Sequence, residues 1–198
     1  MSSVAGKTVV ITGSSRGVGA DTAKILAGEG ANVVVNYRQK APRANKVVKE
    51  ITEAGGHAIA VQADITDAES RAGLFRAAVD EFGGVDVLIL NASGGMETEM
   101  GEDYALRLNR DAQNDTLTEA LRTLPQGGRV VFVTSHQAHF INDVETMPEY
   151  EAVAKSKRAG EDTLTARVPE LQDKGIGFVV VSADMIEGTV TATLLNRA

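Results

Sequence analysis

The 198-residue chain contains no cysteine and no tryptophan. The lack of cysteine excludes a disulfide framework, a thiolate zinc site, an iron–sulfur cluster and a cysteine nucleophile, and it favours a reducing compartment. Aromatic residues are scarce, at five Phe and three Tyr, so few rings are available to stack on bases. Because 27 acidic residues outnumber 20 basic ones, the net charge of −7 would repel a phosphate backbone. We therefore expect no nucleic-acid partner.

Long apolar segments are also lacking. The longest apolar runs, such as residues 130–133 and 178–181, fall far short of the roughly 20 residues that cross a bilayer. The N-terminal sequence MSSVAGKTVVITG has no apolar core of a signal peptide and leads directly into a β-branched stretch. We therefore expect a cytoplasmic protein with no membrane partner.

What the sequence does contain is an alternation of two kinds of segment. Short β-branched runs predict six strands, at residues 8–11, 32–36, 58–62, 85–90, 129–134 and 177–182. Segments rich in Ala, Leu, Glu, Lys and Arg, with apolar residues three and four apart, predict helices at 17–29, 42–54, 67–82, 103–123 and 148–172. The strands are continuous apolar runs, which indicates a parallel sheet covered on both faces.

Strictly alternating strands and helices predict βαβ units with right-handed crossovers. The expected fold is α/β, a Rossmann-type doubly wound parallel sheet in a three-layer α/β/α sandwich, with strand order 3-2-1-4-5-6. No linker, repeat or low-complexity segment divides the chain, so we expect a single domain over residues 1–198. About one short helix follows the sixth strand, so either the chain is truncated or partly ordered, or the sheet has a bare edge.

A glycine-rich turn with the sequence TGSSRGVG, residues 12–19, joins the first expected strand to the first helix. Glycine at position 13 permits a tight turn, at 17 it leaves room for a pyrophosphate, and at 19 it lets the helix pack on the sheet. The spacing is not the literal GxGxxG, but the strand before it and the helix after it predict dinucleotide binding. The turn assigns six residues to the cofactor site: Gly13, Ser15, Arg16, Gly17, Val18 and Gly19.

The end of the second expected strand indicates which dinucleotide is bound. It reads Asn36-Tyr37-Arg38 and lacks the acidic residue that would hold a ribose 2′-hydroxyl. Arg38 and Arg16 would instead form a guanidinium clamp on a 2′-phosphate, which favours NADP(H). Tyr37 is assigned to the same site. The alternative is that both arginines are solvated surface residues.

Several blocks together resemble the short-chain dehydrogenase/reductase family over nearly the whole chain. Residues 12–19 resemble its TGxxxGxG cofactor loop, Asp64-Ile65 its adenine-contacting pair, and Asn91-Ala92-Ser93-Gly94 its NNAG motif. The resemblance implies an NAD(P)-binding Rossmann domain that lacks the family's C-terminal strand and lid. It also implies that five further residues contact the cofactor: Asp64, Ile65, Asn91, Ala92 and Ser93.

Two further residues resemble parts of the family's catalytic machinery. Asn109 in LRLNRDA resembles its helix asparagine, and Ser135 at the end of VVFVTS resembles its catalytic serine. The resemblance implies hydride transfer between a nicotinamide and a carbonyl or alcohol substrate. In that scheme a tyrosine protonates the oxygen, a serine holds the oxygen, a lysine lowers the tyrosine pKa and grips the ribose, and an asparagine completes a proton relay through water.

The tyrosine departs from the family's Tyr-x-x-x-Lys spacing. Alignment of the Ser-Lys-x-Ala segment at 156–159 gives Lys157 the lysine role and puts Val153 in the tyrosine position. Tyr150, one turn before Val153 on the same face, is the candidate substitute, provided that the start of the helix is shifted. Two alternatives remain: Tyr150 pairs with Lys155, or it only caps the helix beside Pro148.

Two histidines before this motif and the segment at 187–189 after it are further candidates for the site. His136 and His139 follow the serine and would supply a proton or line the cleft, and we expect no metal site because only three histidines and no cysteine are present. Gly188 is assigned to the cofactor site, since Glu187-Gly188-Thr189 stands where the family has Pro-Gly and a threonine. Glu187 would face either the nicotinamide or solvent.

Two functions follow from the sequence. The first is an NADP(H)-dependent oxidoreductase that acts on a small carbonyl or alcohol, with Asn109, Ser135, Tyr150 and Lys157 as its catalytic residues. The second is a catalytically impaired NADP(H)-binding module that serves as a sensor or partner subunit, as Val153 and Glu187 suggest. The resemblance also implies a homo-oligomer, either a dimer or a tetramer.

Overall fold

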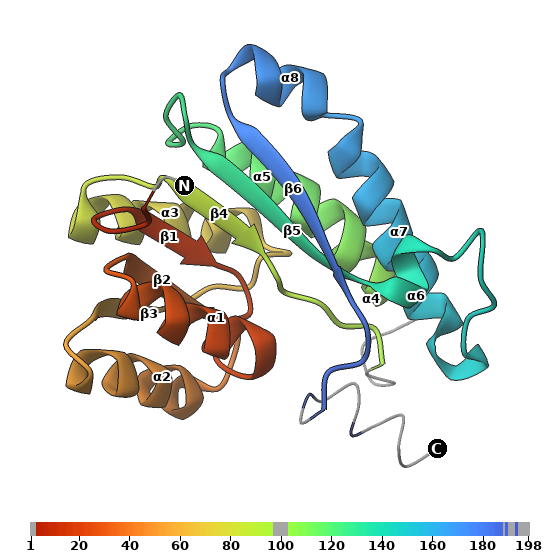
Figure 1. Cartoon of the computed structure of the whole chain (residues 1–198), viewed down its shortest axis with the longest axis horizontal. Coiled ribbons are helices and arrows are strands. Elements are labelled where there is room, and N and C mark those ends of the chain that lie inside the picture. Colours follow the sequence, from red (N-terminus) through yellow and green to blue (C-terminus); the bar gives the residue numbers. More distant parts are fainter. Residues whose placement is uncertain (1–2, 97–102, 188, 190–192, 194–198) are drawn as a thin grey trace.

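The computed structural model describes residues 3–96, 103–187, 189 and 193 (Figure 1). Its strands form one parallel sheet in the order β3-β2-β1-β4-β5-β6, which confirms the predicted fold class and strand order. The strands lie within two residues of the predicted ranges. They are β1 (Thr8–Ile11), β2 (Asn32–Tyr37), β3 (His57–Gln62), β4 (Val87–Leu90), β5 (Arg129–Ser135) and β6 (Gly177–Ala183).

The helices agree with the predictions in the first half of the chain and differ in the second. They are α1 (Gly17–Gly28), α2 (Ala41–Glu53), α3 (Ala68–Phe82), α4 (Tyr104–Leu106), the π-helix η2 (Arg107–Ala112), α5 (Gln113–Ala120), α6 (His136–His139), the 3-10 turn η3 (Pro148–Tyr150), α7 (Glu151–Thr165) and α8 (Val168–Asp173). The helix predicted at 148–172 is therefore divided into three pieces, and α6 was not predicted. None of the helices in the described residues has the length and hydrophobicity of a membrane span.

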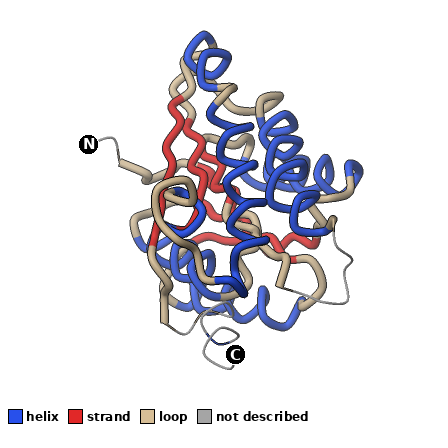
Figure 2. The backbone as a smooth tube through the Cα atoms, turned by 90° about the vertical axis from the view of Figure 1, so that its right-hand side faces the viewer, coloured by secondary structure: helices blue, strands red, loops and turns tan. Residues whose placement is uncertain are grey.

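Two apolar cores lie on opposite faces of the sheet. One joins α1 and α2 to alternate residues of β1 and β2, such as Val9 and Val33. The other joins α3, α5, α7 and α8 to the intervening residues, such as Val10, Val34 and Phe132. The largest group of helices thus lies to one side of the strands (Figure 2). Burial of apolar side chains on both faces stabilises the centre of the sheet.

The expectation of a sheet covered on both faces is wrong for β6. The side chains of β6 alternate between exposed and half-buried positions, and Val179 and Val181 are 39% and 44% exposed. They point away from the α7 side, and no helix of the described residues covers them. The apolar run that reads as a buried strand therefore forms a sheet edge whose second face is open as far as residues 3–96 and 103–187 show.

The turn that leads from β3 to α3 shows how local sequence fixes a helix start. Asp67 is the N-cap of α3, and its carboxylate accepts a hydrogen bond from the Ser70 N–H at 2.8 Å. This bond holds the pKa of Asp67 below its ordinary value. Because all strands are parallel, this turn and the loops after β1, β2, β4, β5 and β6 meet at the carboxyl edge of the sheet.

Candidate functional site

The glycine-rich loop after β1 is fixed by the end of β2. The Gly13 N–H donates to Asn36 Oδ1 at 3.0 Å, and the Ser14 hydroxyl donates to the Ile11 carbonyl at 2.7 Å. The Ser14 oxygen also accepts from the Asn36 N–H at 3.1 Å, and the Asn36 side-chain amide donates to the Ala63 carbonyl at 3.0 Å. Asn36, within β2, thus ties together the loops that follow β1 and β3.

Glycine is required at two positions of this loop because other residues approach closely. Gly13 has a φ of +64°, and a Cβ there would lie 2.9 Å from the Ala92 Cα. A Cβ at Gly19 would lie 2.6 Å from Asn91 Nδ2 and 2.8 Å from the Ser14 Cα. The Asn91 side chain in turn donates to the carbonyls of residues 12 and 13 at 2.9 and 3.2 Å. The loop therefore sits directly on the segment after β4.

The N-terminus of α1 has the features of an anion site. Arg16 is the N-cap, in extended conformation, and no side chain caps the first N–H groups of this helix. No atom lies within 4 Å of the position that a Cβ would take at Gly17. Ser15 and Val18 are half-buried beside it. A diphosphate fits this arrangement, since unsatisfied N–H groups and the helix dipole favour negative charge.

The two arginines of the predicted clamp differ in their surroundings. Arg16 is exposed, whereas Arg38 is half-buried and donates from Nη1 to the Tyr104 hydroxyl. The Arg38 guanidinium carbon also lies 5.6 Å from the centre of the Tyr104 ring. Tyr37 is half-buried and packs against the α1–α2 core. Arg38 is therefore a held side chain and not a solvated surface arginine.

The remaining residues assigned to the cofactor lie at the same edge in different environments. The Asp64 carboxylate accepts from the N–H and the hydroxyl of Thr66, at 2.9 and 2.7 Å. The Ile65 side chain is buried in the core, while Ser93 is exposed. The N–H groups of Asn91 and Ala92 both donate to the hydroxyl of the loop's first residue at 3.0 Å. Gly188 lies outside the described residues.

A cavity of about 390 Å³ opens at the carboxyl ends of β4, β5 and β6. Ser135, Tyr150 and Lys157 line it together, and the Ser135 hydroxyl oxygen lies 3.3 Å from the Tyr150 hydroxyl oxygen. Val18 and Asn91 line the same cavity, so it is continuous with the expected cofactor loop. A serine, a tyrosine and a lysine around one space are the groups that carbonyl reduction requires.

Tyr150 reaches this cavity because the chain makes a 3-10 turn before α7 begins. The turn starts at Pro148, and α7 follows at Glu151. Tyr150 makes no side-chain hydrogen bond to cap α7, and it is 4% exposed in a cluster with Ala138, Val153 and Ala154. Val153 lies within that cluster and does not line the cavity. Tyr150 therefore reaches the cavity from the turn that precedes the first residue of α7.

The two candidate lysines have different partners. Lys157 is half-buried and lines the 390 Å³ cavity. Lys155 Nζ instead lies 2.6 Å from Glu151 Oε1, and its side chain is 66% exposed. Lys155 is therefore an outward-facing residue of α7, and the geometry favours Lys157 as the partner of Tyr150.

Asn109 occupies the π-helix η2 and does not line the cavity. Its Nδ2 donates to the Gly94 carbonyl at 2.8 Å and to the Ser156 hydroxyl at 2.9 Å. A Cβ at Gly160 would overlap the Asn109 carbonyl oxygen, so α7 approaches η2 closely at this glycine. Asn109 thus joins the segment after β4 to α7. Single π-turns of this kind often occur at functional sites.

The histidines and Glu187 take separate positions. His136 lines the cavity, whereas His139 Nδ1 lies 2.6 Å from Glu161 Oε1 on the α7 side. Glu187 is exposed and does not line the cavity, but Thr189 does. Among the described residues, no three His, Asp or Glu side chains form a group that could hold a metal ion.

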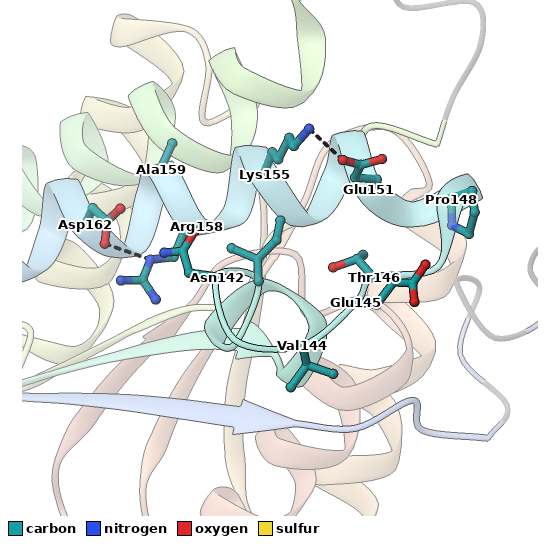
Figure 3. Close-up of a pocket in the computed structure, with 11 residues that line it drawn as sticks. Asn142, Val144, Glu145, Thr146, Pro148, Glu151, Lys155, Arg158, Ala159 and Asp162 are labelled. Atoms are coloured by element: carbon teal, nitrogen blue, oxygen red, sulfur yellow. Dashed lines mark hydrogen bonds and ion pairs between the residues drawn. The ribbon is translucent and has the colours of Figure 1, made fainter.

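A second and larger cavity, of about 570 Å³, lies between α7 and the loop after α6 (Figure 3). Its cations are already neutralised, because Lys155 is paired with Glu151 and Arg158 with Asp162, the latter at 2.9 Å. Neither Ser135 nor any other member of the serine–tyrosine–lysine group lines it. The smaller cavity is therefore the candidate active site.

Four residues with positioning roles were missed in the sequence: Asn36, Tyr104, Ser156 and Gly160. Asn36 lies in the strand end at 36–38, and Ser156 lies in the Ser-Lys-x-Ala segment. In both segments the prediction assigned a role to a neighbouring residue instead, Arg38 and Lys157. The contacts of all four join segments far apart in the chain, so spacing alone gives no signal for them.

Comparison with known proteins gives consistent matches over most of the chain. Residues 7–197 match the family model described as short chain dehydrogenase. A protein of Aspergillus aculeatus named short chain dehydrogenase/reductase AacuN is 36% identical over 194 residues, which cover 95% of this chain and 71% of that protein. Versicolorin reductase 1 of Dothistroma septosporum is 32% identical, with 97% and 74% covered.

Solved structures agree with these sequence matches. The crystal structure of a short chain dehydrogenase from Burkholderia cenocepacia in complex with NADP superposes with a TM-score of 0.81 at 32% sequence identity. The match covers 91% of this chain and 75% of that one.

Proposed function

Because the chain belongs to the short-chain dehydrogenase/reductase family of oxidoreductases, we propose that it transfers hydride between NADP(H) and a carbonyl or alcohol substrate. The observation that carries the proposal is the 3.3 Å approach of the Ser135 and Tyr150 hydroxyl oxygens in a cavity that Lys157 also lines. In this proposal Tyr150 replaces the tyrosine that the family pattern would put at position 153, which makes the chain an atypical member.

Each side chain has a distinct task in the reduction direction. When bound, the nicotinamide supplies the hydride. The Ser135 hydroxyl donates a hydrogen bond to the substrate carbonyl oxygen and holds it beside Tyr150. The Tyr150 hydroxyl gives that oxygen its proton, and the positive charge of Lys157 stabilises the phenolate that remains. Asn109 fixes the start of α7, through Ser156, relative to the segment after β4.

The preference for NADP(H) rests on the end of β2. This end offers the Arg38 guanidinium and no carboxylate, so a 2′-phosphate finds a positive partner there and a 2′-hydroxyl finds no acceptor. The diphosphate would lie at the N-terminus of α1 against Gly17, with Asp64 and Asn91 further along the same edge. The NADP complex of the Burkholderia relative supports this choice.

The cavity lining supports an apolar substrate. Eight apolar side chains line it: Val18, Ile89, Val131, Val133, Val181, Ala183, Met185 and Ile186. Polar residues line the cavity as well, and among them Ser135, Tyr150 and Lys157 are assigned to the reacting oxygen, where they orient a ligand without requiring it to be charged. We include aromatic ketones among the test substrates for this reason and because one relative is named a versicolorin reductase. A single domain, a homo-oligomer and a cytoplasmic location complete the proposal.

A fluorescence titration with NADPH and, in parallel, NADH tests the cofactor, and NADPH oxidation with a panel of aliphatic and aromatic carbonyls tests turnover. We expect micromolar binding of NADPH, weaker binding of NADH, and oxidation of NADPH by at least one apolar ketone. Failure to bind either cofactor would contradict the proposal. Replacement Lys157→Ala should weaken cofactor binding, since its ammonium is assigned to the ribose as well as to Tyr150.

The second candidate function is an NADP(H)-binding module without turnover. It is favoured by Val153, which occupies the expected tyrosine position and is buried beside Tyr150. If no carbonyl consumes NADPH although NADPH binds, this function is preferred. The variant Val153→Tyr should then create activity by restoring the tyrosine four residues before Lys157.

A further inference from the structure

Arg38 and Tyr104 form a contact between two parts of the chain that the sequence keeps 66 residues apart. Arg38 follows the last residue of β2, and Tyr104 is the first residue of α4. The guanidinium donates from Nη1 to the Tyr104 hydroxyl, and its carbon atom lies 5.6 Å from the ring centre. The Arg38 side chain thus donates a hydrogen bond to Tyr104 and makes a cation–π contact with the ring of the same tyrosine.

Tyr104 is itself held firmly. Its side chain is 5% exposed and belongs to the larger apolar core, together with Leu108, Ala112 and Phe132. The backbone of Arg38 is held as well, because its carbonyl accepts from the Gln62 side chain at 3.0 Å. The arginine is therefore fixed at its backbone and at its tip, which removes much of the rotamer freedom that a long side chain would lose on binding a ligand.

The guanidinium keeps the capacity to bind an anion. Within the described residues Arg38 is ion-paired with no carboxylate, unlike Arg71, Arg158 and Arg167. A guanidinium has five N–H donors, and the contact with Tyr104 uses one of them. The contact with Tyr104 is a hydrogen bond and not an ion pair with a carboxylate, so it orients the cation.

From this geometry we infer that Tyr104 is a positioning residue that sets the preference for NADPH over NADH, by holding the Arg38 guanidinium ready for the 2′-phosphate. The inference rests on the proposed use of NADP(H). It differs from the proposal in assigning a role to a core tyrosine that does not line the 390 Å³ cavity. The hydroxyl of Tyr104 is the atom that matters, since the ring alone would fill the same space in the core.

The test measures the dissociation constants of NADPH and NADH for four proteins: the wild type, Arg38→Met, Tyr104→Phe and the double variant. Arg38→Met should lower the preference for NADPH by roughly tenfold to a hundredfold, through loss of a charge-assisted contact. Tyr104→Phe should lower it by about two- to tenfold, the cost of ordering one long side chain upon binding. In the double variant the Tyr104 change should have no further effect.

The affinity for NADH is the internal control, because that cofactor lacks the 2′-phosphate. A role of Tyr104 in core packing alone would weaken the binding of both cofactors or lower the melting temperature, and it would leave their ratio unchanged. The inference is wrong if Arg38→Met abolishes the preference while Tyr104→Phe leaves it intact, or if the two effects are additive. If the wild type itself shows no preference for NADPH, the proposed cofactor is wrong and this inference falls with it.

Discussion

The region around β1 and β2 and the region around β5 and β6 are built from equally apolar strands, yet they are buried differently. All four residues of β1 and the central four of β2 are buried, with α1 and α2 on one face and α3 on the other. In β5 only alternate residues such as Val130 and Phe132 are buried, and in β6 no residue is more than half-buried. The second region thus has one open face in the described part of the chain.

This difference separates two tasks. In the first region, the cofactor loop is fixed by hydrogen bonds such as those of Asn36 and Ser14, and by close approach at Gly19. In the second, Ser135 and Tyr150 converge at the edge of the open face, on a short turn and a strand end. A closely packed loop suits a cofactor that is the same in every reaction cycle. An open and less packed surface suits a substrate whose shape differs from one family member to another.

A large effect is expected in the open region, where Ser135→Ala removes the donor assigned to the substrate oxygen. We expect kcat to fall by about 10² to 10³, as is typical when one such donor is lost. The dissociation constant of NADPH should stay unchanged, because Ser135 is assigned to the substrate oxygen and is not part of the glycine-rich loop. Steady-state kinetics and the fluorescence titration measure the two quantities. Equal losses in both would contradict the separation of tasks.

The next effect concerns the stability of the closely packed region around β1 and β2. A Cβ at Gly19 would clash with the Ser14 Cα and with Asn91 Nδ2, so Gly19→Ala should cost about 1 to 3 kcal/mol of stability. Binding of NADPH should weaken with it, since the loop must shift.

The matched control for this variant is Gly28→Ala near the other end of α1, where no atom lies within 4 Å of the new Cβ. Alanine favours a helix over glycine, so this change should leave the melting temperature the same or raise it slightly. Urea denaturation of both variants makes the comparison. If Gly28→Ala destabilises the protein as much as Gly19→Ala, close approach is not the cause.

A pair of valine substitutions compares the two regions directly. Val34 in β2 is fully buried, and Val34→Ala should cost about 2 kcal/mol through lost burial and the cavity that remains. Val179 in β6 is 39% exposed, and Val179→Ala should cost less than about 1 kcal/mol. Equal losses in urea denaturation would indicate that the face of β6 is covered in solution.

The smallest effect is electrostatic. The pKa of Asp67 is lowered by its hydrogen bond from the Ser70 N–H, so its charged form stabilises the fold above the ordinary carboxyl pKa. That contribution is lost as the pH falls through the lowered pKa. Asp67→Asn keeps the cap but cannot titrate. The difference in melting temperature between the wild type and Asp67→Asn should therefore not be the same at pH 7 as at pH 3. An equal difference at both pH values would contradict this assignment.

Local patterns in the sequence were sufficient for much of this fold. The β-branched runs and the glycine turn predict the six strands, their order and the region around Gly13, because each signal lies within a few residues. The helix predicted at 148–172 was wrong in its continuity, since composition alone does not reveal the 3-10 turn that brings Tyr150 to Ser135. The contact of Arg38 with Tyr104 and the open face of β6 depend on segments distant in sequence, which periodicity cannot report.

The central claim is that Tyr150, three residues before the position that the family pattern predicts, supplies the proton. The most direct test is the turnover of Tyr150→Phe with NADPH and a carbonyl that the wild type reduces, measured beside the NADPH dissociation constant. Phenylalanine fills the same buried space without the hydroxyl, so we expect kcat to fall by about 10² to 10⁴ while the affinity for NADPH is preserved. Full turnover by this variant would contradict the claim and would transfer the role to His136, the histidine that lines the same cavity.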